Sequence, residues 1–166
     1  MAQAPRPKGE RRLDRVLQQI PIAREQLLAA IEDLGPGFNP EAIETAMQSG
    51  DPRERNKVAV IERELDLLIA YLEELASRGL AEGQRLDVVP KGDGRPWDHL
   101  AELRVISAAS AARLQSVKEM RNELAHAYPP TSWRALHQAV ENLLAELDAY
   151  KVKVADWLDE NGILTL

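Results

Sequence analysis

Apolar residues recur along the chain at alternating steps of three and four positions, the spacing of one face of an α-helix. This pattern occupies residues 10–34, 51–79, 96–128 and 131–162. A shorter segment, EAIETAMQ at residues 41–48, lies between the first two and has the same character. The sequence therefore predicts four long helices and one short helix.

Prolines and glycines mark the expected ends of these helices. Pro21 should kink or divide the first helix, because its ring lacks an N–H and crowds the preceding turn. Asn39 followed by proline is a good start for the short helix. Gly79 is a natural stop for the second long helix, and the stretch 80–95 is then the longest irregular connection. Pro129 and the proline after it should end the third.

The third long helix has an unusual apolar face, because small and charged residues interrupt it. The small residues Ser107 and Ser110 should let a neighbouring helix approach closely, within the chain or from a second subunit. The positions on this face are Leu100, Leu103, Ser107, Ser110, Leu114, Val117, Arg121, Leu124 and Tyr128.

Together these elements predict an all-α fold, an up-and-down bundle of about four to five helices. Aromatic residues make up only 4% of the 166 residues, which also disfavours sheet. We expect a disordered tail at residues 1–9 and a single domain at residues 10–162.

Composition and charge narrow the possible functions. The chain has no cysteine, which excludes disulfides, thiolate metal sites and a thiol nucleophile. The net charge of −6 argues against general nucleic-acid binding, although it permits a small local site. The basic residues from Arg6 to Arg15 are interpreted as a solvated, flexible tail without a role. No apolar run is long enough to span a membrane, so we expect a soluble cytoplasmic protein.

The segment RNELAHAY, residues 121–128, holds the strongest candidate chemistry. A buried arginine needs a carboxylate, a dimer mate or an anionic ligand. Arg121 offers a fork of donors suited to phosphate, and His126, about 140° around the helix, can exchange a proton near neutral pH. Asn122 and Tyr128 add hydrogen-bonding groups. Such a set could cut RNA without a metal: a base takes the 2′-hydroxyl proton, the oxygen attacks the phosphate, and arginine stabilises the developing charge.

This segment resembles the R-x4-H-x-Y motif of the HEPN superfamily, in particular the HepT-like ribonuclease toxins of HEPN/MNT toxin-antitoxin pairs. The resemblance covers residues 52–160 and leaves residues 10–50 as an N-terminal extension. It implies a homodimer in which two motifs form one composite ribonuclease site on RNA, with no cofactor or metal. By this likeness Arg121 and His126 are the catalytic pair and Asn122 supports them. Tyr128 would be adenylylated by a nucleotidyltransferase antitoxin of the MNT type, which blocks the site.

Two other readings remain open. The chain could be a non-catalytic helical module of the same ancestry, whose motif serves dimerisation or partner docking. It could also be a purely structural bundle in which Arg121 pairs with a buried glutamate such as Glu62 or Glu64.

The histidines allow weaker metal-site hypotheses. Glu123 and His126 have the Glu-x-x-His spacing of di-iron bundles, but only one such motif exists. His137 and Glu141 could clamp a metal, although a surface hydrogen bond is the simpler reading. His99 is expected to face solvent.

Overall fold

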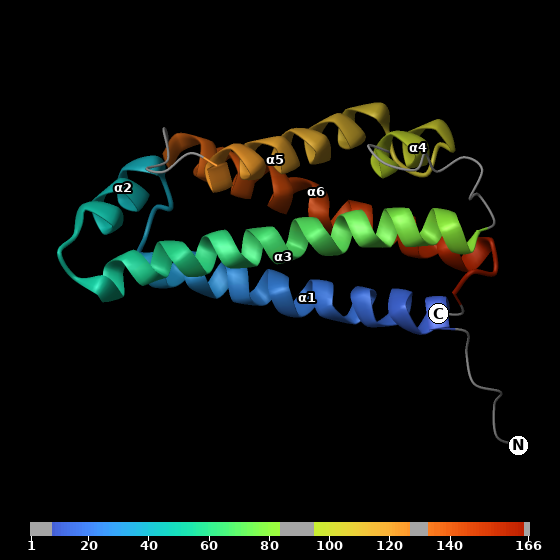
Figure 1. Ribbon diagram of the computed structural model, residues 1–166, viewed down its shortest axis with the longest axis horizontal. Helices are drawn as coiled ribbons and strands as arrows, with labels where there is room; N and C mark the ends of the chain where they lie inside the picture. The colour runs from blue at the N-terminus through green and yellow to red at the C-terminus, as the bar shows by residue number, and fades with distance from the viewer. Residues whose placement is uncertain (1–7, 84–94, 127–132, 165–166) are drawn as a thin grey trace, which may run out of the picture.

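The computed structural model describes residues 8–83, 95–126 and 133–164. These residues form α1 (Lys8–Leu34), α2 (Pro40–Gln48), α3 (Pro52–Glu82), α4 (Pro96–Glu102), α5 (Ala108–His126) and α6 (Trp133–Glu160). α1 and α3 lie side by side, α5 lies on the opposite side of the molecule, and α6 runs from α5 across to α3 (Figure 1). No strand occurs in these ranges, so the predicted all-α class is confirmed.

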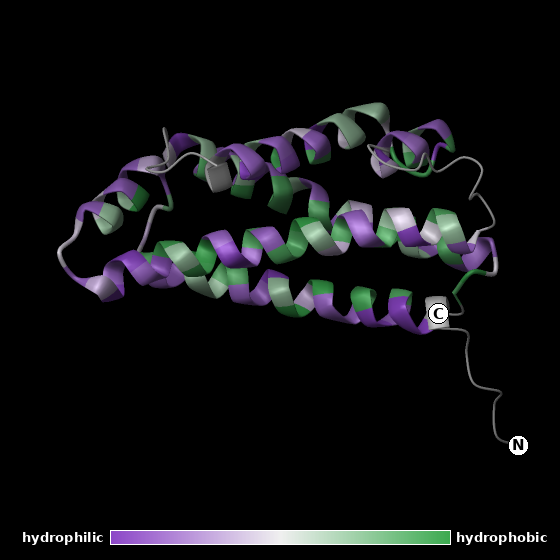
Figure 2. Cartoon of the chain, in the orientation of Figure 1, coloured by the Kyte–Doolittle hydropathy of each residue, from purple (hydrophilic) through white to green (hydrophobic). Residues whose placement is uncertain are grey.

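The N-terminal helix α1 begins at Lys8, two residues before the predicted start, and continues through Pro21 without a break. It runs antiparallel to α3, and its apolar positions lie on the side that faces α3 (Figure 2). Leu13, Ile20 and Leu27 on this face are at most 1% exposed. Burial of this face against α3 thus holds α1 in place despite the backbone N–H that Pro21 lacks.

α2 and α3 begin with the same capping pattern, which the sequence predicts for α2. The Asn39 side-chain oxygen accepts a hydrogen bond from the backbone N–H of Ala42 at 2.8 Å, with Pro40 as the first helical residue. Asp51 caps α3 in the same way, accepting from the N–H of Arg53 at 2.9 Å. Each cap satisfies an N–H group that the first helical turn leaves free.

The predicted stop at Gly79 is wrong, because α3 continues to Glu82. Gly79 is a packing residue instead: a Cβ atom there would lie 3.0 Å from a ring carbon of Trp157 and 3.1 Å from a methyl of Leu158. The absence of a side chain allows α6 to approach α3 closely at this point.

The single helix predicted for residues 96–128 is two helices. α4 ends in a Schellman motif, in which the N–H of Val105 bonds to the carbonyl of Leu100 at 2.9 Å and that of Arg104 to Ala101 at 2.9 Å. Arg104 adopts the left-handed conformation that this motif requires, with φ of 59°. Leu103 is consequently 38% exposed and does not belong to the core face.

Within the chain, Ser107 and Ser110 do not have the predicted packing role; the alternative, contact with a second subunit, stays a prediction. The Ser107 hydroxyl oxygen accepts a hydrogen bond from the backbone N–H of Ser110 at 3.0 Å, and its side chain lies at the surface. Ser107 therefore acts as the N-cap of α5. The small side chain starts a new helix, and no helix of the described residues packs on it.

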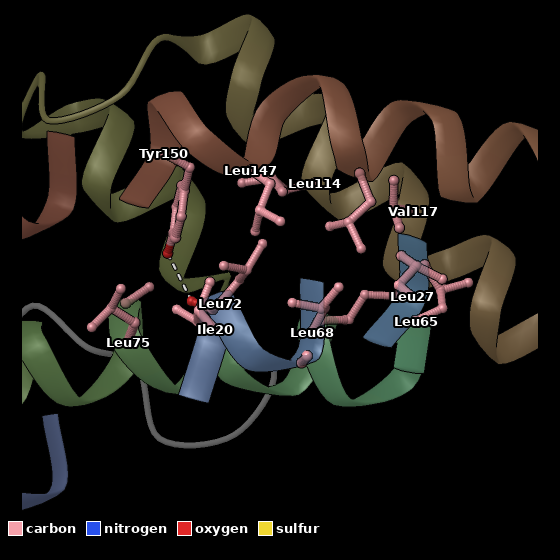
Figure 3. Packing of buried hydrophobic residues seen from close by; sticks show 14 of the residues in the cluster. Ile20, Leu27, Leu65, Leu68, Leu72, Leu75, Leu114, Val117, Leu147 and Tyr150 are labelled. Atoms are coloured by element: carbon pink, nitrogen blue, oxygen red, sulfur yellow. Dashed lines mark hydrogen bonds between the residues drawn. The ribbon is translucent and has the colours of Figure 1, made fainter. Parts of the chain in front are cut away.

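The core contains a hydrogen-bonded connection among three helices. The Tyr150 hydroxyl on α6 donates to the backbone carbonyl of Leu72 on α3 at 2.7 Å and accepts from Nε1 of Trp97 on α4 at 3.2 Å. Figure 3 shows the Tyr150 hydroxyl pointing at Leu72, among buried leucines. Burial raises the pKa of Tyr150 well above its ordinary value, so the phenol stays protonated and can donate.

Candidate functional site

Arg121 lies near the C-terminal end of α5, on the side of this helix that faces α3. Its Nε–H donates to Oδ1 of Asp66 on α3 at 2.8 Å, and 37% of its side chain is exposed. Val117, one turn earlier on the same face, is 1% exposed. The apolar face of α5 thus reaches the surface at Arg121, which places the guanidinium at the edge of the core.

The partner of Arg121 differs from the predicted glutamates. Glu64 is fully buried and its carboxylate accepts from the neighbouring Arg63 at 2.8 Å. It lies two residues before Asp66, about 200° around α3, and so points away from α5. Glu62 shares the Asp66 side of α3 but makes no ion pair with Arg121. The structural reading was therefore wrong about the residue, although Arg121 does have a carboxylate partner.

Of the other motif residues, the structure describes Asn122 fully and His126 only by its backbone. Asn122 is exposed, and its side-chain oxygen accepts from Nη1 of Arg121 at 3.2 Å. His126 is the last residue of α5, in the same unbroken helix as Arg121, which sets a rise of about 7.5 Å between their backbones. The side chain of His126 and all of Tyr128 lie outside the described part of the chain.

Glu62 lies one turn before Asp66 on the same side of α3. Burial raises the pKa of Glu62, and the neighbouring negative charge of Asp66 raises it further. Asp66 is 46% exposed. The surface of α3 that Arg121 contacts is thus acidic: Asp66 accepts from the guanidinium, and Glu62 lies one turn before Asp66.

Sequence reasoning did not identify Asp66, although a signal was present. Asp66 and Glu73 are seven positions apart on α3 and therefore share one side of the helix. They accept from Arg121 and Lys118 of α5, each at 2.8 Å. An acidic row on one predicted helix and a basic row on another suggest this pairing once the two helices are taken to be antiparallel.

The basic residues at the N-terminus are not a flexible tail, as far as they are described. Arg12 lies within α1, and its Nε donates to Glu74 on α3 at 2.6 Å. This hydrogen bond lowers the pKa of Glu74. Arg12 and Arg15 also line a small pocket of about 140 Å³ together with Tyr71.

The two described histidine side chains have structural contacts. Nε2 of His137 lies 3.1 Å from the backbone carbonyl oxygen of Phe38 and 3.7 Å from Glu141. His99 is not solvent-facing as predicted: its side chain is 16% exposed, because α4 packs against α3 and α5, and its Nδ1 lies 3.5 Å from Glu102. No group of three or more potential ligands for a metal occurs among the described residues.

The fold and the motif together define the class of protein. It is a helical bundle in which Arg121 is partly exposed near the end of α5, and His126 is the last residue of that helix. The model of the family described as ribonuclease HepT-like matches residues 53–154, and the chain belongs to this ribonuclease family. The match begins in the first turn of α3 and includes the whole of α4 and α5. No curated protein and no solved structure matches the chain. None of the helices in the described ranges is long and apolar enough to cross a membrane.

Proposed function

We propose that this protein is a metal-independent endoribonuclease and the toxin of a HEPN/MNT-type toxin-antitoxin pair. The observation that supports this most directly is the position of Arg121, which is partly exposed at the edge of the core in a chain of the HepT-like ribonuclease family. An arginine at this exposed position can contact a phosphate while the backbone of α5 stays helical.

The reaction needs one base and one cation. His126 takes the proton of a ribose 2′-hydroxyl, the 2′-oxygen bonds to the adjacent phosphorus, and the 5′-oxygen leaves with a proton from the acid form of histidine. Arg121 stabilises the extra negative charge on the phosphate oxygens, and Asn122 holds the guanidinium through its side-chain oxygen. The products are a 2′,3′-cyclic phosphate end and a 5′-hydroxyl end.

The catalytic proposal is tested by RNA cleavage in the presence of a chelator. Arg121→Ala and His126→Ala should each lower the rate at least about a hundredfold with the fold retained. Lys118→Ala is the matched control, because Lys118 pairs with Glu73 between the same two helices and lies outside the motif. Full activity in His126→Ala would reject the catalytic role and favour a binding module.

The composite site requires a homodimer in which the two motifs face each other. Because the chain lacks cysteine, a single cysteine at exposed position Asn122 reports the distance between two copies. Asn122→Cys should form an intermolecular disulfide under mild oxidation, whereas Asp159→Cys on the exposed end of α6 should not. Equal cross-linking of the two variants, or none, would reject this arrangement.

The antitoxin proposal concerns Tyr128. A nucleotidyltransferase partner with ATP should add adenylyl groups to this tyrosine and stop RNA cleavage. Mass spectrometry should find the modification on the wild-type protein and not on Tyr128→Phe. Modification at another residue would refute the assignment.

A further inference from the structure

Arg121 is anchored on two sides of its guanidinium. Nε–H donates to Asp66 at 2.8 Å, and Nη1 donates to Asn122 at 3.2 Å. A guanidinium has five N–H donors, so these bonds leave the Nη2 donors and one on Nη1 without a described partner. The Nη donors are a part of arginine that can bind two phosphate oxygens at once.

The two anchors come from different places in the fold. Asn122 is the next residue on α5 and moves with Arg121, whereas Asp66 belongs to α3. Of these two described anchors, Asp66 is therefore the one that fixes the guanidinium relative to the rest of the bundle. The neighbouring pair of Lys118 and Glu73 keeps the same two helices in contact independently.

We propose that Asp66 is a positioning residue for RNA cleavage: it holds the Nε edge of Arg121 so that the Nη edge is presented to the scissile phosphate. This inference rests on the proposed ribonuclease function. Because both side chains are more than a third exposed, the pair contributes little to the stability of the fold. Its effect is expected in the orientation of the guanidinium.

Two substitutions separate orientation from charge. Asp66→Ala removes the acceptor and leaves the long Arg121 side chain free to rotate. Asp66→Asn keeps an oxygen acceptor at the same position and removes the negative charge, which otherwise repels RNA. Glu73→Ala is the matched control, because it breaks the other 2.8 Å pair between α3 and α5.

The experiment measures kcat and KM for a labelled single-stranded RNA. Asp66→Ala should lower kcat about tenfold or more, since small misplacements of a catalytic group have large effects on rate. Asp66→Asn should keep kcat within about threefold of wild type and lower KM. Glu73→Ala should keep the kcat of wild type. An unchanged or raised kcat in Asp66→Ala would overturn the proposal and show that Asp66 is structural or masks the arginine.

A second measurement does not depend on cleavage. In protein labelled with 15N-arginine, the Nε–H of Arg121 should exchange slowly with solvent in the wild type and in Asp66→Asn, and quickly in Asp66→Ala. Equal exchange in wild type and Asp66→Ala would overturn the positioning role. If wild type did not cut RNA, the proposed function would fail separately, while the exchange data would still decide whether Asp66 orients Arg121.

Discussion

Removal of one oxygen atom by Tyr150→Phe should measurably destabilise the bundle. The Tyr150 hydroxyl connects Leu72 of α3 with Trp97 of α4, and the side chains of Tyr150 and Trp97 are at most 2% exposed. Phenylalanine fills almost the same volume, so no large cavity forms. The change therefore tests the hydrogen bonds and hardly affects packing.

The magnitude follows from the groups left behind. The bond to the Leu72 carbonyl contributes about 0.5–1.5 kcal/mol net, and the buried Trp97 N–H left without its acceptor costs about 1–3 kcal/mol. We therefore expect a loss of roughly 2–4 kcal/mol in the free energy of unfolding. For a protein of this size, that corresponds to a fall of roughly 5–15 °C in Tm.

The assay is urea unfolding followed by far-UV circular dichroism, with the midpoint compared at unchanged slope. Tyr71→Phe is the control, because Tyr71 is half-buried on α3 and its hydroxyl has no hydrogen bond to the described residues in the structure. A loss below about 0.5 kcal/mol in Tyr150→Phe, equal to that of the control, would refute the assigned hydrogen bonds.

A pH series tests the same hydroxyl. Because the folded pKa of Tyr150 is raised above its ordinary 10.0, its contribution to stability is complete below that pH and is lost as the pH rises beyond it. Stability of the wild type should therefore decline more steeply above pH 10.0 than that of Tyr150→Phe. Parallel declines would contradict the assigned burial of the phenol.

Three further substitutions test local features by urea unfolding. Ser107→Ala removes the acceptor for the Ser110 N–H and should cost about 1 kcal/mol; no loss would contradict the cap. Arg104→Gly removes the backbone strain of an arginine at a positive φ of 59° and should stabilise the fold by roughly 0.5–1 kcal/mol. A loss of stability would show that contacts of the arginine side chain outweigh this strain. Glu62→Gln should stabilise at neutral pH, because the raised pKa of Glu62 means that its ionised form destabilises the fold. This gain should vanish as the pH falls below the ordinary value of 4.5, and a gain independent of pH would refute the cause.

The helices with a strong apolar stripe could be predicted from the sequence, and their ends could be predicted where a typical capping residue occurs. α6 ends in a Schellman motif at Gly162, which has φ of 63°, close to the predicted end. α4 ends in the same motif, but Arg104 occupies the left-handed position. An arginine gives no local signal for this conformation, so the break at residues 103–107 depends on tertiary packing, in which Ile106 becomes 4% exposed.

Only part of the candidate site could be predicted from the sequence, because its other part depends on how two helices pack. The motif residues Arg121 and Asn122 are read directly from the sequence, and the structure brings their side chains into contact. Asp66 is 55 positions away from Arg121, and its role depends on the rotation and register of α3 against α5. The pattern within one helix contains no such information, because Glu62, Glu64 and Asp66 all have carboxylate side chains and only the rotation of α3 selects among them.

The same dependence on packing bears on the N-terminal extension. The family match starts at residue 53, yet α1 buries Leu13, Ile20 and Leu27 almost completely in the same core as Leu68 and Leu72 of α3. α3 has one face toward α1 and another toward α5. A change in the position of α1 can therefore alter the rotation of α3 about its own axis. That rotation determines whether Asp66 meets Arg121. Residues 8–34 thus pack on the helix that carries Asp66, although they lie far from the motif in sequence.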